Sequence, residues 1–366
     1  MKKIKDKPLY IKLQKRRFLK TQERARFYKE FRSHLNTLSR RLKKEEKYRS
    51  PYRGLQLTAE NVVDAPNNLL LNSNTNQVLD FIRKIENKFN AKKPVFVNLN
   101  NVQDIDSGAI ILLLSIMIKF KSGNIEFNGN FPKRLTAIEL LRTSGFFESL
   151  NKKEFQEEDN YEIAGTDKGG ILTHANKRVD PILAARLIET SSLTIWKEIR
   201  RCQGVYRVLI ELMQNTNNHA EIGKPGEKHW WLSVNHTSGE RKVRFAFVDL
   251  GVGIFESLAH KPSDSKFAKW KEKFQNFIEG KNNPELLRLI LSGNFHFTVT
   301  GLDFRGKGLP GIFHAQKLGQ ISGLRIITND TYCCPSENSY VKLSTPFIGT
   351  FVYWEVNKDN VNCKSN

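Results

Sequence analysis

The sequence predicts an α/β protein with three parts: a basic helical arm over residues 1–58, a first α/β domain over residues 59–160, and a second over residues 161–366. Three observations support this prediction. The chain of 366 residues is long enough for two domains of ~150 residues each and an extension. Segments with strand-like and helix-like spacing alternate after residue 58, as in proteins whose helices pack on a sheet. The excess positive charge is concentrated near the N-terminus.

The composition is that of a globular protein. Hydrophobic residues make up 39% of the chain and charged residues 27%, which argues against an integral membrane protein and against full disorder. The longest largely apolar stretch is residues 109–118, whereas a membrane-spanning helix needs about 20 residues. The four cysteines, Cys202, Cys333, Cys334 and Cys363, have neither zinc-ligand nor paired spacing. We therefore expect no membrane span and a location in the reducing cytoplasm.

The N-terminal arm carries most of the net charge of +21. Residues 1–54 contain 20 Lys or Arg and five Asp or Glu, a net charge of about +15. Residues 12–48 lack Pro and Gly and contain good helix formers, which predicts a helix. Such an arm could bind the phosphate backbone of DNA or RNA. It could equally be a solvated helical extension that packs an apolar stripe on the main body.

In the first α/β domain, strands are expected to alternate with amphipathic or apolar helices. The predicted strands are Leu69–Leu71, Pro94–Leu99 and Ile125–Phe127, and the predicted helices are Gln77–Phe89, Ser107–Phe120 and Arg134–Leu141. This order indicates a small layered α/β structure.

The turn into the helix at Ser107 resembles that of a STAS domain. The resemblance covers about residues 69–150 and depends on Val95–Val102, Ile105–Ala109, Phe131–Pro132 and Leu140–Phe146. It implies that Ser107 could accept a phosphoryl group and that a protein partner could bind through this domain. The residues alone also fit a simpler role, in which Asp106 or Ser107 caps the helix. A phosphate at this helix N-terminus would be compatible with both roles.

The second α/β domain contains the residues with the clearest chemistry. The predicted strands are Ile171–His174, Val243–Val248 and Phe351–Val356, and the predicted helices are Pro181–Cys202, Val205–His219 and Ile312–Leu318. In the helix Val205–His219, Glu211, Asn215 and His219 are four residues apart, so successive side chains drift by only ~40° around the helix. They can therefore face one ligand. An amide oxygen suits Mg²⁺, and a carboxylate can orient a water or hydroxyl, although this pattern is also common on solvated helix surfaces.

Two glycine-containing motifs follow this helix. The strand Val243–Val248 ends in Asp249, with Gly251 and Gly253 after it. An Asp in this position can accept a hydrogen bond from an exocyclic amine, and the glycines allow a flat base to approach the backbone. The second motif is Arg305–Ile312, a glycine-rich turn with Lys307 that leads into a helix. Free N–H groups at such a turn favour phosphate.

In this order, the three motifs resemble the GHKL superfamily of Bergerat-fold ATPases over about residues 181–356. The resemblance implies a Bergerat-fold α/β sandwich that binds ATP and Mg²⁺, after the basic arm and the STAS-like domain. By resemblance Glu211 is the general base, Asn215 the Mg²⁺ ligand, and Asp249 the residue that reads adenine, with Gly251 and Gly253 beside the base. Gly306, Lys307, Gly308 and Leu309 match the box that covers the phosphates, and Gly349–Thr350 match the last nucleotide-contacting box.

We therefore expect a Mg²⁺-dependent ATP hydrolase or protein serine kinase that acts as a nucleotide-driven switch with its STAS-like domain. Water and Ser107 both remain open as the phosphoryl acceptor. A protein partner could also bind the long segment 255–303, and two copies of the chain could pair. The alternative function is nucleic-acid binding by residues 1–54, with the GHKL domain as a regulatory or inactive nucleotide-binding module.

Overall fold

A computed structural model of the chain describes residues 60–144, 146, 171–175, 179–219, 230–259, 282–293, 308–360 and 363–365. The side chains of residues 143, 171–175, 217–219, 259 and 363–365 are not described. The chain divides into two units, residues 1–58 and residues 59–366. The predicted basic arm is the first of these units and lies outside the described residues, so all that follows concerns the second unit. None of the helices in the described parts of the chain is long and apolar enough to cross a membrane.

Residues 60–146 form a small parallel α/β layer. A three-stranded sheet has the order β1-β3-β5, and β2 pairs with β4. The strands are β1 (Val62–Asp64), β2 (Asn68–Leu69), β3 (Val95–Asn98), β4 (Asp104–Ile105) and β5 (Phe127–Gly129), and the helices are α2 (Thr75–Asn90), α3 (Ser107–Ser122) and α4 (Leu135–Thr143). The mixed α/β class and the alternation of elements are confirmed. Strands β1 and β4 are additions to the prediction, because both are too short to give a periodic pattern.

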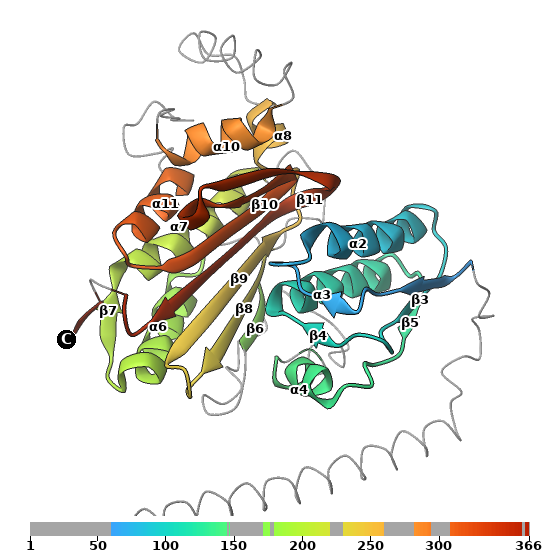
Figure 1. Ribbon diagram of the computed structural model, residues 1–366, viewed down its shortest axis with the longest axis horizontal. Coiled ribbons are helices and arrows are strands. Elements are labelled where there is room, and N and C mark those ends of the chain that lie inside the picture. The colour runs from blue at the N-terminus through green and yellow to red at the C-terminus, as the bar shows by residue number, and fades with distance from the viewer. Residues whose placement is uncertain are drawn as a thin grey trace, which may run out of the picture. The chain divides into compact units, whose positions relative to one another are not determined.

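Residues 171–365 form a larger antiparallel sheet with helices. The five-stranded sheet has the order β10-β11-β9-β8-β6 (Figure 1). Its strands are β6 (Ile171–Ala175), β8 (Trp230–Thr237), β9 (Lys242–Asp249), β10 (Ser322–Cys334) and β11 (Ser339–Asn357). The helices are α6 (Pro181–Trp196), α7 (Gln203–His219), α8 (Ile254–Ala259), α10 (Asn283–Leu291) and α11 (Gly308–Lys317), and η2 (Pro335–Glu337) is a single 3₁₀ turn. On one sheet face, α6, α7, α10 and α11 bury a single core with side chains such as Phe245 and Trp354.

The predicted helix Pro181–Cys202 is too long. Helix α6 ends at Trp196, because Lys197 adopts a left-handed conformation with φ 65°, which stops an α-helix. The chain then forms strand β7 (Arg200–Cys202), which pairs with β12 (Cys363–Ser365). In this pairing Cys202 lies opposite Cys363.

The cysteine assignment also needs correction. Cys202 is disulfide-bonded, while Cys333 and Cys334 are buried free thiols. The expectation that no cysteine is paired is therefore wrong for Cys202. Sequence spacing could not reveal that Cys202 has a disulfide partner, since β7 and β12 are brought together only by folding. A disulfide is typical of an oxidising environment or of redox chemistry, so cysteine usage gives no support to the predicted reducing cytoplasm.

The opposite face of the large sheet packs on the parallel layer. Helix α3 contacts β8 and β9, and α2 contacts β11. Every residue of α3 from Gly108 to Ile116 is buried, because the helix has apolar neighbours both in its own layer and on the large sheet. One continuous core therefore includes Ile110 of α3 together with Val248 and Phe351 of the sheet. The residues assigned by sequence to two separate α/β domains share this core and lie in one compact unit.

Gly108 marks the closest approach of α3 to the sheet. A Cβ atom at this position would lie 2.8 Å from the end of the Phe351 ring and 3.1 Å from Leu71 Cδ2. Phe351 is fully buried, so its ring can move only by displacing the side chains packed around it. We expect Gly108→Ala to lower the free energy of unfolding by about 1–3 kcal/mol through overpacking, measured by urea denaturation. The control is Gly239→Ala, where a Cβ would meet nothing within 4 Å and the change should stay within about 0.5 kcal/mol. Equal effects of the two substitutions would contradict this packing.

Candidate functional site

Helix α7 presents a polar face at the edge of the core. Leu209, Leu212 and Met213 bury its other face, so the helix is anchored and its polar residues are held in place. Glu211 and Asn215 are one turn apart on the partly exposed side, and the Glu211 side chain is 24% exposed. The alignment predicted from their spacing is confirmed for these two residues. His219 is the last residue of α7, but its side chain lies outside the described residues.

Partial burial changes the acidity of Glu211. Desolvation raises the pKa of its carboxyl group, while the guanidinium of Arg207 acts in the opposite direction and does not cancel the rise. Arg207 Nε lies 3.9 Å from Glu211 Oε1, one turn earlier on α7. A carboxylate with a raised pKa holds a proton more strongly than a free Glu and is therefore a better general base.

The start of α11 lies directly over these two side chains. Gly308 is the first residue of α11. A Cβ on Gly308 would lie 3.1 Å from Asn215 Nδ2 and 3.2 Å from Glu211 Oε2, so glycine at this position lets α11 approach the two side chains closely. The folded chain thus brings the glycine-rich segment to α7 across nearly 100 residues. Leu309 is partly buried against the core below, while Gly306 and Lys307 lie outside the described residues.

Asp249 stands in a row of side chains across the large sheet. The pairing register places Trp230, Asp249, Thr350 and Thr328 side by side on β8, β9, β11 and β10. Phe247 of β9 and Val352 of β11, two residues from Asp249 and Thr350, belong to the core that α7 covers. Because strand side chains alternate between faces, Asp249 and Thr350 lie on the α7 face as well.

Asp249 is bonded to the same helix that carries Glu211 and Asn215. Its carboxylate accepts a hydrogen bond from Gly251 N–H at 2.7 Å and one from the hydroxyl of Thr216. Burial raises the pKa of the Asp249 carboxyl group to about 6, although both hydrogen bonds act to lower it. Thr216 Oγ1 also lies 3.2 Å from Leu212 O. Its single proton therefore has two acceptors when Asp249 is ionised.

Two further glycines shape the surroundings of Asp249. Gly253 has φ 83° and Gly349 has φ 120°, conformations that other residues rarely adopt. A Cβ on Gly349 would lie 2.0 Å from Asp249 O, so β11 can approach β9 here only because position 349 is glycine. Thr350 follows directly and is half-buried opposite Asp249.

Ser107 does not belong to this group. Its helix α3 packs on the face of the large sheet that is opposite to α7. Asp106 caps α3 by accepting a hydrogen bond from Ala109 N–H at 2.8 Å, which confirms the capping role. Ser107 itself is half-buried. The large sheet therefore stands between Ser107 and Glu211.

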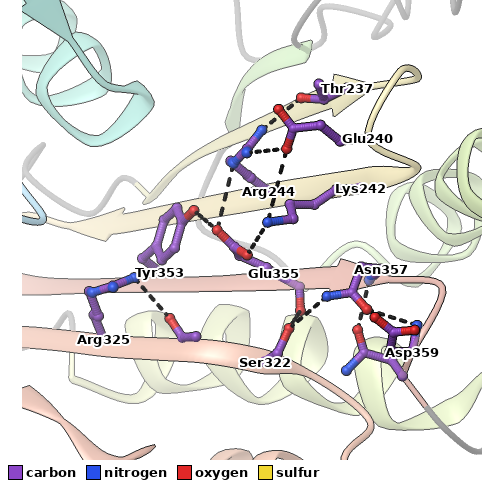
Figure 2. A network of polar contacts seen from close by, with 12 residues as sticks. Thr237, Glu240, Lys242, Arg244, Ser322, Arg325, Tyr353, Glu355, Asn357 and Asp359 are labelled. Atoms are coloured by element: carbon purple, nitrogen blue, oxygen red, sulfur yellow. Dashed lines mark hydrogen bonds and ion pairs between the residues drawn. The ribbon is translucent and has the colours of Figure 1, made fainter. Parts of the chain in front are cut away.

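A second polar cluster lies at the other end of β9 and β11 (Figure 2). Glu355 accepts a hydrogen bond from Tyr353 at 2.6 Å and forms an ion pair with Lys242 at 3.0 Å. Arg244 pairs with Glu240 at 2.7 Å and lies 3.6 Å from Glu355. These charges neutralise one another and tie the ends of neighbouring strands, which is a structural role.

Sequence reasoning missed Arg207 and Thr216 on α7 and the β10 residues Thr328 and Asn329. Thr216 directly follows Asn215 and lies one turn beyond Leu212, so its nearness to the site could have been inferred. Asn329–Asp330 interrupts a strand of mostly β-favouring residues, which is a recognisable sign of a bulge. Within the described residues, no three His, Cys, Asp or Glu side chains are grouped as metal ligands. A metal in the site would need oxygen ligands from Asn215, from a bound substrate and from water.

Comparison of the chain with protein-family models, with curated proteins and with solved structures gives no match. What the site can do therefore follows from its own geometry and chemistry.

Proposed function

We propose that the protein is a Mg²⁺-dependent ATP-binding protein of the GHKL type that hydrolyses ATP. The observation that carries the proposal is that two segments distant in sequence, the start of α11 and the end of β9, both contact helix α7. Gly308 lies against Glu211 and Asn215, and Asp249 is bonded to Thr216 of the same helix. A carboxylate that can accept from a purine amine, an amide oxygen for a cation and a carboxylate base are thus held on or against two turns of α7.

Each group has a role that its chemistry supports. The Asp249 carboxylate would accept a hydrogen bond from the exocyclic amine of adenine. Asn215 Oδ1 is a hard oxygen donor of the kind that Mg²⁺ accepts beside waters and phosphate oxygens, and the cation, when bound, neutralises phosphate charge. The glycine at position 308 lets the N-terminus of α11, which favours anions, lie close to Asn215 and Glu211.

Glu211 would activate the nucleophile. A water next to its carboxylate would attack the γ-phosphorus while the bond to the β,γ-bridging oxygen breaks, and the proton of that water would pass to Glu211. The raised pKa of Glu211 supports this role. We assign water as the acceptor rather than Ser107 of the same chain, because the large sheet separates Ser107 from Glu211.

The shared core supports a switch function. Val248 and Phe351 contribute to the core with α3, and their neighbours Asp249 and Thr350 face α7. A change in the strand ends on nucleotide binding would therefore reach the parallel layer through two adjacent strands. A protein partner that binds the parallel layer could sense the nucleotide in this way.

Isothermal titration of the full chain tests the proposal. We expect ATP with Mg²⁺ to bind, and EDTA to weaken binding at least about tenfold, because it removes the cation that would join the phosphate oxygens to Asn215. AMP, which lacks the β- and γ-phosphates, should also bind more weakly than Mg·ATP. It serves as the matched ligand control. A dissociation constant for Mg·ATP weaker than about 1 mM, or equal binding of ATP and AMP, would overturn the proposal.

A further inference from the structure

A bulge in the β10–β11 pair adjoins the row that contains Asp249. Thr328 lies opposite Thr350, but the next residue, Asn329, lies opposite Phe347. Strand β11 therefore has two extra residues here, Ile348 and Gly349. Asn329 itself has φ 49°, a left-handed conformation that Asn tolerates better than most residues.

The Asn329 side chain holds the turn that follows Asp249. Its Nδ2 donates a hydrogen bond to Val252 O at 3.0 Å, and its Oδ1 accepts one from Phe255 N–H at 3.2 Å. A Cβ on Gly253 would lie 2.4 Å from Asn329 Oδ1, so the amide lies flat against the turn. One planar group thus bonds the backbone on both sides of Gly253.

Thr328 holds the same turn from the adjacent position. Its buried hydroxyl accepts a hydrogen bond from Ile254 N–H at 2.9 Å and donates one to Gly349 O at 3.1 Å. The turn after Asp249 and the bend before Thr350 are therefore joined through one side chain. The next residue, Asp330, ties β10 to α10 instead, since its Oδ1 accepts a hydrogen bond from Asn283 at 2.7 Å.

We infer that Asn329 is a positioning residue for the base of the nucleotide: it fixes the Val252–Gly253 turn at the spacing from Asp249 and Thr350 that a purine ring requires. The inference rests on the proposed function. The Asn329 side chain bonds to backbone atoms of the turn and to the Thr328 hydroxyl, and none of its described bonds go to Glu211 or Asn215. A substitution of Asn329 should therefore weaken binding of the base and leave binding of the phosphates unchanged.

The test compares ATP with inorganic tripolyphosphate, each with Mg²⁺, as ligands of the full chain in isothermal titration. Asn329→Gly keeps the left-handed backbone accessible and removes the side-chain hydrogen bonds to Val252 O and Phe255 N–H. We expect about tenfold weaker ATP binding and unchanged tripolyphosphate binding. A tenfold loss corresponds to the net free energy of roughly one hydrogen bond. Asn329→Asp keeps an acceptor for Phe255 N–H and should restore part of the ATP affinity.

Asn338→Gly is the matched control. Asn338 also has φ 49°, but it ends the η2 turn at the far end of β10, so ATP affinity should stay within about twofold of wild type. The inference is overturned if Asn329→Gly binds ATP like wild type, or if it loses ATP and tripolyphosphate to the same extent. Absence of ATP binding by the wild-type protein would instead overturn the proposed function and the inference with it.

Discussion

Asp249→Asn is expected to abolish most ATP binding and, without nucleotide, to make the protein more stable at pH 8. Replacing the carboxylate by an amide puts a donor group where an adenine amine needs an acceptor. The loss of a hydrogen bond to a charged group is about 1.5–3 kcal/mol, or about 10- to 100-fold in affinity. Isothermal titration of Mg·ATP measures it.

The stability effect follows from the buried charge. Burial raises the Asp249 pKa from 3.8 to about 6 in the folded protein, so the folded state holds this proton more tightly than the unfolded state. The protonated Asp249 carboxyl group therefore stabilises the folded state fully below about pH 4, and this stabilisation is lost as pH rises through about 6. At pH 8 the ionised carboxylate therefore costs about 3 kcal/mol relative to the protonated form. Asparagine avoids this cost and keeps an oxygen for Gly251 N–H.

Urea unfolding at two pH values measures the second effect. We expect Asp249→Asn to raise the free energy of unfolding by about 1–3 kcal/mol at pH 8 and to differ little from wild type at pH 4. Asp80→Asn is the control, because Asp80 is exposed on α2 and pairs with Lys84 at the surface; its effect should stay within about 0.5 kcal/mol at both pH values. The same gain at pH 4 and pH 8 would show that Asp249 is not a buried charge.

Glu211→Gln should separate turnover from binding. The amide keeps the shape of the side chain but cannot take a proton from water, so the rate of ATP hydrolysis should fall by about 10²- to 10⁴-fold. Mg·ATP affinity should remain within about threefold of wild type, since Glu211 is assigned no ground-state contact with the nucleotide. Phosphate release under saturating Mg·ATP is the measurement. In the wild-type protein, the rate should increase with pH through the raised pKa of Glu211 and then level off.

A second Glu→Gln substitution provides the control. Glu189 is exposed on α6, and Glu189→Gln should leave both hydrolysis and binding unchanged. If Glu211→Gln retains turnover within about fivefold of wild type, another group is the base and the assignment of Glu211 is wrong.

The elements that could be predicted from the sequence are those with a strong local pattern. Helix α7 has apolar residues on one face and Glu211 and Asn215 on the other, and this is how it folds. Strand β9 alternates and ends at Asp249 as expected. Both features depend on spacing over a few residues, which a sequence shows directly.

The features that could not be predicted depend on contacts between distant segments. The pairing of β7 with β12 joins residues more than 150 positions apart, and neither strand has more than three residues. Asn329–Asp330 could have indicated a bulge, but the two extra residues that β11 has opposite it, Ile348 and Gly349, have no periodicity that marks them. Gly108 reads as an ordinary small residue near a helix start, and only the nearness of Phe351 gives it a function.

The apolar character of α3 determines how the protein can be dissected. Trp231, Val248 and Phe351 are sealed from water by α2 and α3. A fragment that begins at residue 161 would expose this sheet face to solvent, which is the kind of surface that drives aggregation. Truncation experiments that aim to isolate residues 161–366, which contain the proposed ATP site, must therefore retain residues 59–146 or replace their buried partners with polar side chains.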